Sequence, residues 1–204
     1  VYTAPFAITP GTVVTACAVT GAYRPSVQTY LTYSAAGHVF RDVRPTDAYY
    51  TEIDAAYTAG LMAGVGHDRF LPDMATNRAT FVTILYRLAG SPAVTDTPVY
   101  TDMSADTWYA APVCWATANG IIDGFADGTF RGTAELTREQ AAAILYRYAR
   151  LTGADTSARA GAADFPDFDA VNGYAVDAVL WAAAKGYIQP PGGRLEPRGS
   201  ISRA

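Results

Sequence analysis

The sequence predicts a mainly α-helical protein: three helix-loop-helix repeats packed as a pseudo-threefold bundle, with a short N-terminal β-strand segment. Three observations lead to this prediction. Sequence landmarks recur in order in three copies about 60 residues apart, apolar residues within the copies follow helical spacing, and the first 36 residues carry Val, Thr and Tyr in two strand-like runs. We predict an accessory module at 1–36 and repeats at 37–99, 100–163 and 164–204.

The N-terminal segment comes first in the chain. Two runs rich in Val, Thr and Tyr flank a Gly-Ala-Tyr-Arg-Pro turn at 21–25, a pattern that predicts strand, turn, strand. The segment resembles the second half of a chitobiase C-terminal-type β module, an accessory β-sandwich of exported proteins that has no hydrolytic residues. The stretches on which this resemblance rests are 2–6, 10–14 and 18–26.

The repeats are defined by landmarks that keep their order and spacing. Each copy opens with an aromatic residue two positions before an aspartate, and later has an arginine directly after a potential helix N-cap; between them lies a Gly-x-x-x-Gly segment. The landmarks are Asp42, Asp102 and Asp167, the segments 60–64 and 120–124, and Arg78, Arg138 and Arg203. In the third copy Pro190 stands where the second glycine would be. Agreement in triplicate indicates repeated structural units.

Each copy is expected to begin with a short helix that has one buried face. Apolar residues recur at i, i+3 and i+4 from Ile53 and again from Val113, and a glycine follows each pattern. Trp115 and Trp181 lie in the middle of such helices and are predicted to be core residues. Because short helices cannot bury their own apolar faces, we expect the copies to pack on one another.

A second helix is predicted near 78–89 and 138–151. Asn77 and Thr137 are natural N-caps, and Thr137-Arg-Glu-Gln140 fits the capping-box pattern. The matching helix of the third copy would start at Arg203, next to the last residue of the sequence. We therefore expect the third repeat to contain its first helix only.

Composition excludes several classes of function. The net charge of −4 comes from 15 basic and 19 acidic residues with no basic block, so nucleic acid is not an expected partner. No apolar run approaches the length that a membrane span needs, and no membrane insertion is expected. Two cysteines and two histidines lie outside metal-binding or catalytic spacings. We expect no metal, no cofactor and no enzymatic activity.

The repeats resemble the S-layer homology domain over roughly 37–204. The landmarks above, Asp-Gly-Thr-Phe at 127–130 and Thr-Arg-Glu-Gln at 137–140 make this resemblance, the family signature being Thr-Arg-Ala-Glu. The resemblance implies a spindle of three repeats whose grooves bind secondary cell-wall polysaccharide, often carrying pyruvate ketals, at the bacterial cell surface. It also implies a non-covalent anchor for cargo domains fused upstream.

The repeated arginines are the first candidate ligand-binding residues. Arg78, Arg138 and Arg203 each place a positive charge at the positive end of a helix dipole, which suggests that something negative compensates. A helix N-terminus with free N–H groups and a guanidinium would bind a carboxylate such as a pyruvate ketal. The alternative is an internal salt bridge to the repeated aspartates or a nearby glutamate.

The other candidates each have a structural alternative. Trp108 stands where the family commonly has Trp and could stack on a sugar or fix a helix start to the core. Gly64 and Gly124 could let a sugar approach the backbone, or could provide a positive φ. The aspartates at 42, 102 and 167 could touch ligand or cap a turn. The stretch 123–128 looks like a calcium loop but lacks the required oxygen positions.

The leading hypothesis is a binding module that tethers an exported protein to cell-wall glycan. One alternative is a structural module that mediates self-assembly of a surface layer. A further alternative is the non-catalytic tail of a surface glycoside hydrolase, since no juxtaposed pair of acids is apparent in the sequence.

Overall fold

The computed structural model describes residues 13–16, 29–32, 40–95, 98–188 and 191–204. The chain forms two compact units. The first comprises residues 1–72 together with Ala204, and the second comprises residues 73–203. Their boundary lies inside the first repeat, so that the first helix of this repeat belongs to one unit and its second helix to the other.

The described residues of the first unit form two strands and one α-helix. Strands β1 (Val13–Ala16) and β2 (Thr29–Thr32) pair antiparallel, with Val13 opposite Thr32. The remainder of the predicted module at 1–36 lies outside the described residues, and its likeness to the chitobiase-type module stays a prediction. Helix α1 (Tyr50–Thr58) is followed by Gly60 in a left-handed conformation, φ 68°, as expected for a C-terminal glycine.

A small aromatic core surrounds α1. Phe40, Val43, Ile53 and Phe70 are buried in it. The ring of Phe40 meets the edge of Tyr57 at 5.1 Å between centroids and lies 5.3 Å from Phe70. The aromatic residue that opens the repeat therefore joins the helix to the loop that follows it.

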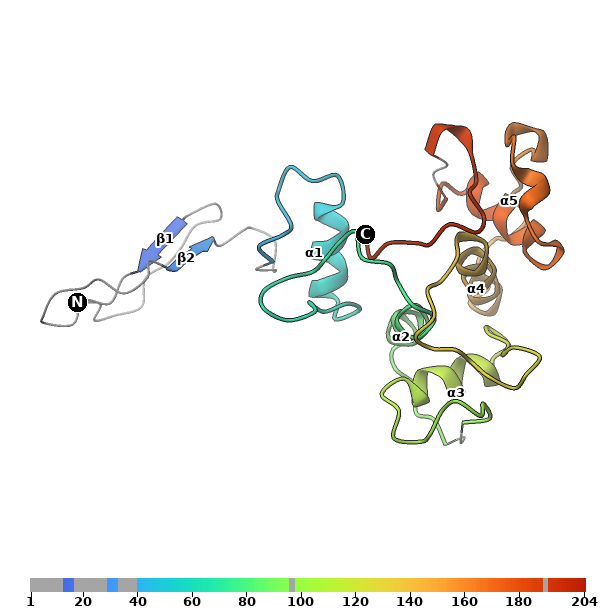
Figure 1. The fold of residues 1–204 in the computed structure, drawn as a ribbon, viewed down its shortest axis with the longest axis horizontal. Coiled ribbons are helices and arrows are strands. Elements are labelled where there is room, and N and C mark those ends of the chain that lie inside the picture. The colour runs from blue at the N-terminus through green and yellow to red at the C-terminus, as the bar shows by residue number, and fades with distance from the viewer. Residues whose placement is uncertain (1–12, 17–28, 33–39, 96–97, 189–190) are drawn as a thin grey trace, which may run out of the picture. The chain divides into compact units, whose positions relative to one another are not determined.

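Where the structure describes it, the second unit has four α-helices, which Figure 1 shows in green to orange. They are α2 (Arg78–Leu88), α3 (Ala110–Ala118), α4 (Arg138–Leu151) and α5 (Val176–Ala184). Short 3₁₀ turns lie at Ala162–Asp164, Phe168–Ala170, Gly173–Ala175 and Pro191–Gly193. Helix α2 packs on α3 and α4 packs on α5, so the second helix of each copy packs on the first helix of the next.

The predicted helix starts are confirmed. Asn77 accepts a hydrogen bond from the Thr80 N–H, and Thr137 forms the full capping box with Gln140. Within the described part of the third copy, α5 is the one α-helix, and residues 200–203 are not helical.

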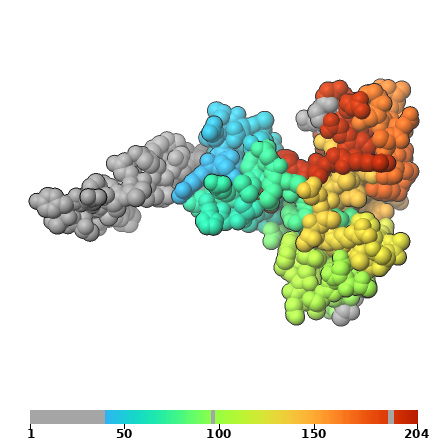
Figure 2. Space-filling model, viewed as in Figure 1, coloured from blue at the N-terminus to red at the C-terminus, as the bar shows by residue number. Residues whose placement is uncertain are grey.

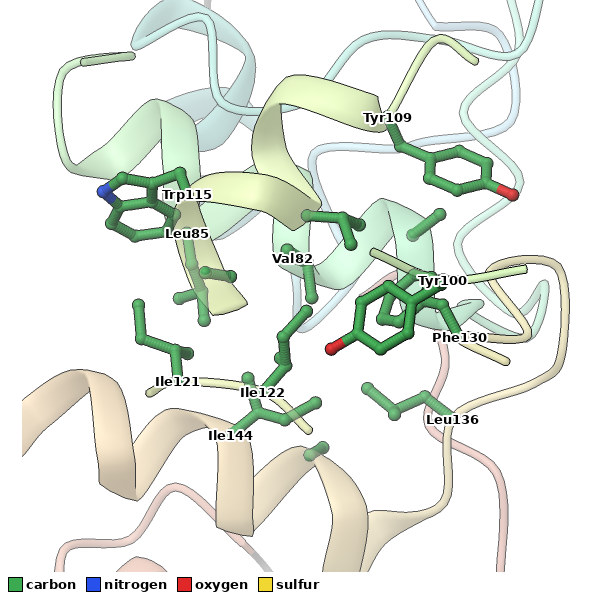
Figure 3. Packing of buried hydrophobic residues seen from close by; sticks show 14 residues of the cluster. Val82, Leu85, Tyr100, Tyr109, Trp115, Ile121, Ile122, Phe130, Leu136 and Ile144 are labelled. Carbon is green, nitrogen blue, oxygen red and sulfur yellow. The ribbon is translucent and has the colours of Figure 1, made fainter. Parts of the chain in front are cut away.

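The larger core of the second unit lies where α2, α3 and α4 meet (Figure 3). Val82 and Leu85 of α2 face Val113 and the buried Trp115 of α3, and Ile144 of α4 closes the cluster. The opposite face of α4 carries small residues that pack on α5 around Val179 and Trp181. Figure 2 shows the second repeat, yellow-green and yellow, and the third, orange and red, as neighbouring parts of this unit. Both mid-helix tryptophans are core residues, as predicted.

A ring of three main-chain hydrogen bonds joins the three copies. Leu136 donates to the Thr76 carbonyl at 2.9 Å, Ile201 donates to Leu136 at 3.0 Å, and Thr76 donates to Ile201 at 2.8 Å. These residues occupy the same repeat position, two before each arginine. The ring ties the end of the third copy to the second-helix starts of the other two.

Candidate functional site

Each repeat contains an aspartate that holds its loop. Both carboxylate oxygens accept main-chain N–H bonds of 2.7–2.9 Å from consecutive residues 28 and 29 positions later. The pairs are Phe70 and Leu71 on Asp42, Phe130 and Arg131 on Asp102, and Leu195 and Glu196 on Asp167. Burial raises the pKa of these carboxyls, but the main-chain bonds outweigh it and lower the pKa below its usual value.

The second donor of each pair has an unusual backbone conformation. Leu71, Arg131 and Glu196 have φ of 56°, 55° and 47°, a left-handed region that disfavours side chains. The aspartate offsets this strain because it fixes the N–H of the strained residue. The three aspartates thus have the turn role that the sequence left open, while their contact with a ligand stays a prediction.

Arg78 reaches from the start of α2 into the loop of the second repeat. Its Nε donates to the Phe130 carbonyl at 2.9 Å, and its Nη2 donates to the Asp123 carbonyl at 3.3 Å. The guanidinium lies 5.0 Å from the Phe125 ring and 4.9 Å from the Phe130 ring. Burial lowers the pKa of this guanidinium. The negative partners that its position requires are carbonyl oxygens and ring faces, rather than an aspartate side chain.

The main-chain N–H groups at the starts of α2 and α4 are not free, contrary to the expectation from the sequence. The Arg78 and Ala79 N–H groups donate to the Ala134 and Gly132 carbonyls at 3.0 and 2.9 Å. In α4, the Arg138 and Glu139 N–H groups donate to Gly199 and Pro197 at 2.8 and 3.0 Å. The N–H groups of the third residues are bound by the N-caps. This expectation was wrong because the next repeat supplies the carbonyls that satisfy the helix start.

The arginine pattern repeats at the next junction. Nε of Arg138 donates to the Leu195 carbonyl at 2.9 Å, which matches the bond from Arg78 to Phe130. The third predicted arginine, Arg203, lies in the non-helical stretch 200–203. Its main-chain N–H donates to the Met74 carbonyl at 3.0 Å. The arginine at a junction therefore acts on the loop of the following repeat, not on its own.

A pocket of about 320 Å³ opens beside Arg78. All three repeats contribute to it: α2 through Arg78, the second repeat through the 122–125 loop and α4, and the third through Tyr174. Its polar and aromatic lining consists of Arg78, Asp123, Phe125, Gln140, Arg147 and Tyr174. Gly124 also lines it. Two of the predicted site residues, Arg78 and Gly124, are thus brought together.

The pocket contains two arginines in different states. Nε and Nη2 of Arg78 donate to the loop carbonyls, whereas its Nη1 takes part in no hydrogen bond with the described residues. Nη1 of Arg147 forms an ion pair with the Asp123 carboxylate at 2.8 Å. The side chains of this pair are 36% and 76% exposed. The ion pair is therefore open to solvent and to a ligand.

Tyr174 is held at the pocket by a buried carboxylate. Glu139 is buried, accepts the Asn172 N–H at 2.9 Å and a bond from the Asn172 side chain, and accepts the Tyr174 hydroxyl at 3.3 Å. Burial and the Glu139 carboxylate raise the pKa of Tyr174 to about 12. The hydroxyl therefore stays protonated at neutral pH and remains a donor.

The two predicted loop glycines are needed for space. A Cβ on Gly64 would lie 2.6 Å from Cε1 of Phe40, and a Cβ on Gly124 would lie 2.9 Å from the Thr129 carbonyl oxygen and closer still to the Tyr100 ring. Neither residue has a positive φ, so the turn explanation was wrong. In the first two repeats, the opening aromatic residue packs directly against this glycine.

Trp108 does not line the pocket. Trp108 as a residue is 64% exposed, and its ring meets the Tyr109 ring edge-on at 5.1 Å between centroids. Tyr109 is 8% exposed and belongs to the core. The residue that fixes the start of α3 to the core is therefore Tyr109. Sugar stacking by Trp108 stays a prediction.

The stretch that resembles a calcium loop forms a tight turn. The Asp127 carboxylate accepts bonds from the Thr129 hydroxyl and N–H and pairs with Arg131 at 2.7 Å. These bonds lower the pKa of Asp127 to about 2. No cluster of metal-ligating side chains occurs in the part of the chain that the structure describes. Within the same residues, no helix is long and apolar enough to cross a membrane.

Five polar and aromatic pocket residues were not predicted from the sequence as site residues: Asp123, Phe125, Gln140, Arg147 and Tyr174. A signal for Arg147 was present, since Ile-Leu-Tyr-Arg occurs at 84–87 and again at 144–147. Tyr174 is the residue after the Trp108 position in the third copy, and only tertiary packing shows that it lines the pocket. Asp123 differs from Ala63 in the first copy, and the one pattern that includes it, the calcium-like stretch 123–128, does not indicate a role in the pocket.

Helix-loop-helix units that share cores across their junctions define a helical repeat protein. The family model of the S-layer homology domain matches residues 39–82, 99–142 and 164–204, more than half of the chain. The chain therefore belongs to the S-layer homology domain family.

Several curated proteins are similar to this chain. A protein named cell surface glycoprotein 1, from Acetivibrio thermocellus, is 27% identical over 151 residues, which is 70% of this chain and 6% of that protein. Outer membrane protein SlpA of Thermus thermophilus is 50% identical over 48 residues, 24% of this chain and 5% of its own length. An endoglucanase from a Bacillus species is 26% identical over 159 residues, 74% of this chain and 17% of the enzyme. The chain spans a small part of each of them.

Proposed function

We propose that the chain anchors an exported protein to the bacterial cell wall by binding secondary cell-wall polysaccharide. The acidic group that we propose it recognises is a pyruvate ketal on the sugar. The observation on which this proposal rests is the junction pocket, where two arginines and a tyrosine line a space of about 320 Å³. Membership of the S-layer homology family supports it, as do relatives that are named as surface proteins. The chain is a non-catalytic module of the cell surface.

The chemistry of the pocket suits a sugar that carries a carboxylate. Nη1 of Arg78 and the guanidinium of Arg147 can donate charge-assisted hydrogen bonds to it. Tyr174 is 57% exposed, and its ring offers an apolar face to the sugar ring. Because the hydroxyl of Tyr174 is already bound to Glu139, the ring has a fixed orientation.

We also propose that the three copies form a pseudo-threefold bundle. The closed ring of hydrogen bonds through Thr76, Leu136 and Ile201 supports this arrangement. The equal junctions at Arg78 and Arg138 support it as well. In such a bundle the pocket beside Arg78 is one of a set of related sites, and domains fused upstream would be the cargo.

The similarity to an endoglucanase favours one kind of cargo. A module of this family in the same chain as a glycoside hydrolase would hold the enzyme at the wall while taking no part in its chemistry. The two hypotheses, a glycan anchor and the non-catalytic tail of a surface hydrolase, then describe the same anchoring function, with the hydrolase as the cargo.

Sedimentation with purified cell walls tests the proposal. The chain should sediment with intact walls and remain in solution with walls stripped of their attached polysaccharide. Arg147→Ala should weaken binding about tenfold, since a charge-assisted contact is lost. Arg150→Ala is the matched control, because it removes the same charge from the exposed end of the same helix. Equal sedimentation with stripped walls would favour assembly between protein copies instead.

A further inference from the structure

The ion pair between Asp123 and Arg147 points to a role for Asp123 in the selectivity of the junction pocket. Asp123 contacts both pocket arginines. Its carbonyl accepts Nη2 of Arg78 at 3.3 Å, and its carboxylate pairs with Nη1 of Arg147 at 2.8 Å. One residue of the 122–125 loop therefore occupies donors that an acidic ligand would otherwise use.

The two contacts of Asp123 differ in how easily a ligand can replace them. The bond to Arg78 involves the main chain of a packed loop, and Arg78 is buried. The carboxylate is 76% exposed, and exposed ion pairs contribute little to stability. A carboxylate from solution can take its place on Arg147 without disturbing the loop.

We propose that Asp123 is a resident competitor of acidic ligands: its carboxylate occupies Arg147 in the free protein and must be displaced when an acidic sugar binds. This inference rests on the proposed function of the pocket. Displacement lowers the affinity for every acidic ligand. It also favours ligands whose carboxylate bonds to Arg78 and Arg147 together, because these gain more than the ion pair that they break.

The other copies support a role that is specific to this pocket. At the position of Asp123, the first copy has Ala63 and the third copy has Gln189. Neither of these copies therefore supplies a carboxylate there. Arg147 corresponds to Arg87 in the first copy. The competitor is thus a feature of one junction and not a requirement of the fold.

Calorimetric titration with a pyruvylated wall disaccharide, and with the same disaccharide lacking the ketal, tests this role. Asp123→Asn should bind the acidic sugar about two- to fivefold more tightly and leave the affinity for the neutral sugar unchanged. Asp127→Asn is the matched control. It also removes one negative charge near the pocket, but the Asp127 carboxylate pairs with Arg131 and not with Arg147. It should have the smaller effect.

A double-mutant cycle separates competition for Arg147 from a general change in charge. In an Arg147→Gln background, Asp123→Asn should give no gain for the acidic disaccharide. Weaker or unchanged binding by Asp123→Asn in the parent background would overturn the role of Asp123 while leaving the proposed function intact. Failure of the parent chain to bind either disaccharide would instead overturn the proposed function, and the role of Asp123 with it.

Discussion

Tyr109 and Tyr174 occupy the same position in the second and third repeats but lie in different surroundings. Tyr109 is 8% exposed and packs in the core, whereas Tyr174 is 57% exposed and lines the junction pocket. A Cβ on Gly132 would lie 2.6 Å from Cζ of Tyr109, so the buried position needs a glycine opposite. The third repeat has Pro197 there, whose ring would take up that space.

We therefore expect the residue at this loop position to influence where the tyrosine lies. In the second repeat, which has Gly132, the Tyr109 ring is buried in the core. In the third repeat, which has Pro197, the Tyr174 hydroxyl donates to the Glu139 carboxylate at 3.3 Å. The tyrosine that lines the pocket thus belongs to a repeat whose loop sequence differs from that of the second.

The largest effect is expected from Gly132→Ala. The added methyl group would force the Tyr109 ring out of its position, and such overpacking should lower the free energy of unfolding by about 1–3 kcal/mol. Urea unfolding measures this change. Gly173→Ala is the control, because a Cβ there meets no atom within 4 Å and φ is not positive. Equal stability of Gly132→Ala and the parent would show that Gly132 does not decide where Tyr109 lies.

The next effect compares the two arginine junctions. Arg78→Met should lower the free energy of unfolding by about 2 kcal/mol, since it leaves the Phe130 and Asp123 carbonyls without their donor and removes two ring contacts. Arg138→Met should cost about 1 kcal/mol, because it removes the donor to the Leu195 carbonyl. Thermal melts of both variants should rank them in this order. The reverse ranking would mean that the aromatic flank of Arg78 adds no stability.

A smaller, pH-dependent effect is expected from the loop aspartates. Asp102→Asn cannot accept both main-chain bonds and should lower the free energy of unfolding by about 1 kcal/mol at pH 7. Because the pKa of Asp102 is lowered in the folded state, its stabilisation is present above the pKa of the unfolded chain, near 3.9, and is lost as the pH falls through the folded pKa.

Urea unfolding at several pH values checks this sign. The stabilities of the parent and Asp102→Asn should converge on acidification below pH 4 and should differ by a constant amount above pH 6. Asp167→Asn should behave alike, because the third repeat has the same pair of main-chain bonds. A stability difference that grows on acidification would contradict the assignment of these carboxylates as ionised loop holders.

Much of the fold could be predicted from local patterns. Periodicity located the helices, and the N-caps Asn77 and Thr137 were recognised because capping depends on residues three apart. The site could not be predicted in the same way. Gly124 shares a pocket with Arg78 of the preceding repeat rather than with Arg138 of its own, and this pairing depends on which loop each helix start meets. Likewise, Tyr174 lines the pocket whereas Tyr109, at the same repeat position, is buried in the core, and this difference depends on tertiary packing.

The smallest expected effect would extend the pocket. Gly173 occupies the position of Trp108 and lies next to Tyr174, and a side chain there would meet no atom within 4 Å. Gly173→Trp should add an aromatic face at the pocket edge and strengthen binding of the pyruvylated disaccharide about two- to fivefold, which corresponds to less than about 1 kcal/mol. Calorimetric titration measures the gain, with Gly173→Ala as the control for lost backbone freedom. Because the indole would stack on the sugar ring and not on the ketal, the neutral disaccharide should gain by a similar factor. A gain for the acidic sugar alone would indicate that the indole acts on the arginines, and no gain for either sugar would place the bound sugar ring away from Tyr174.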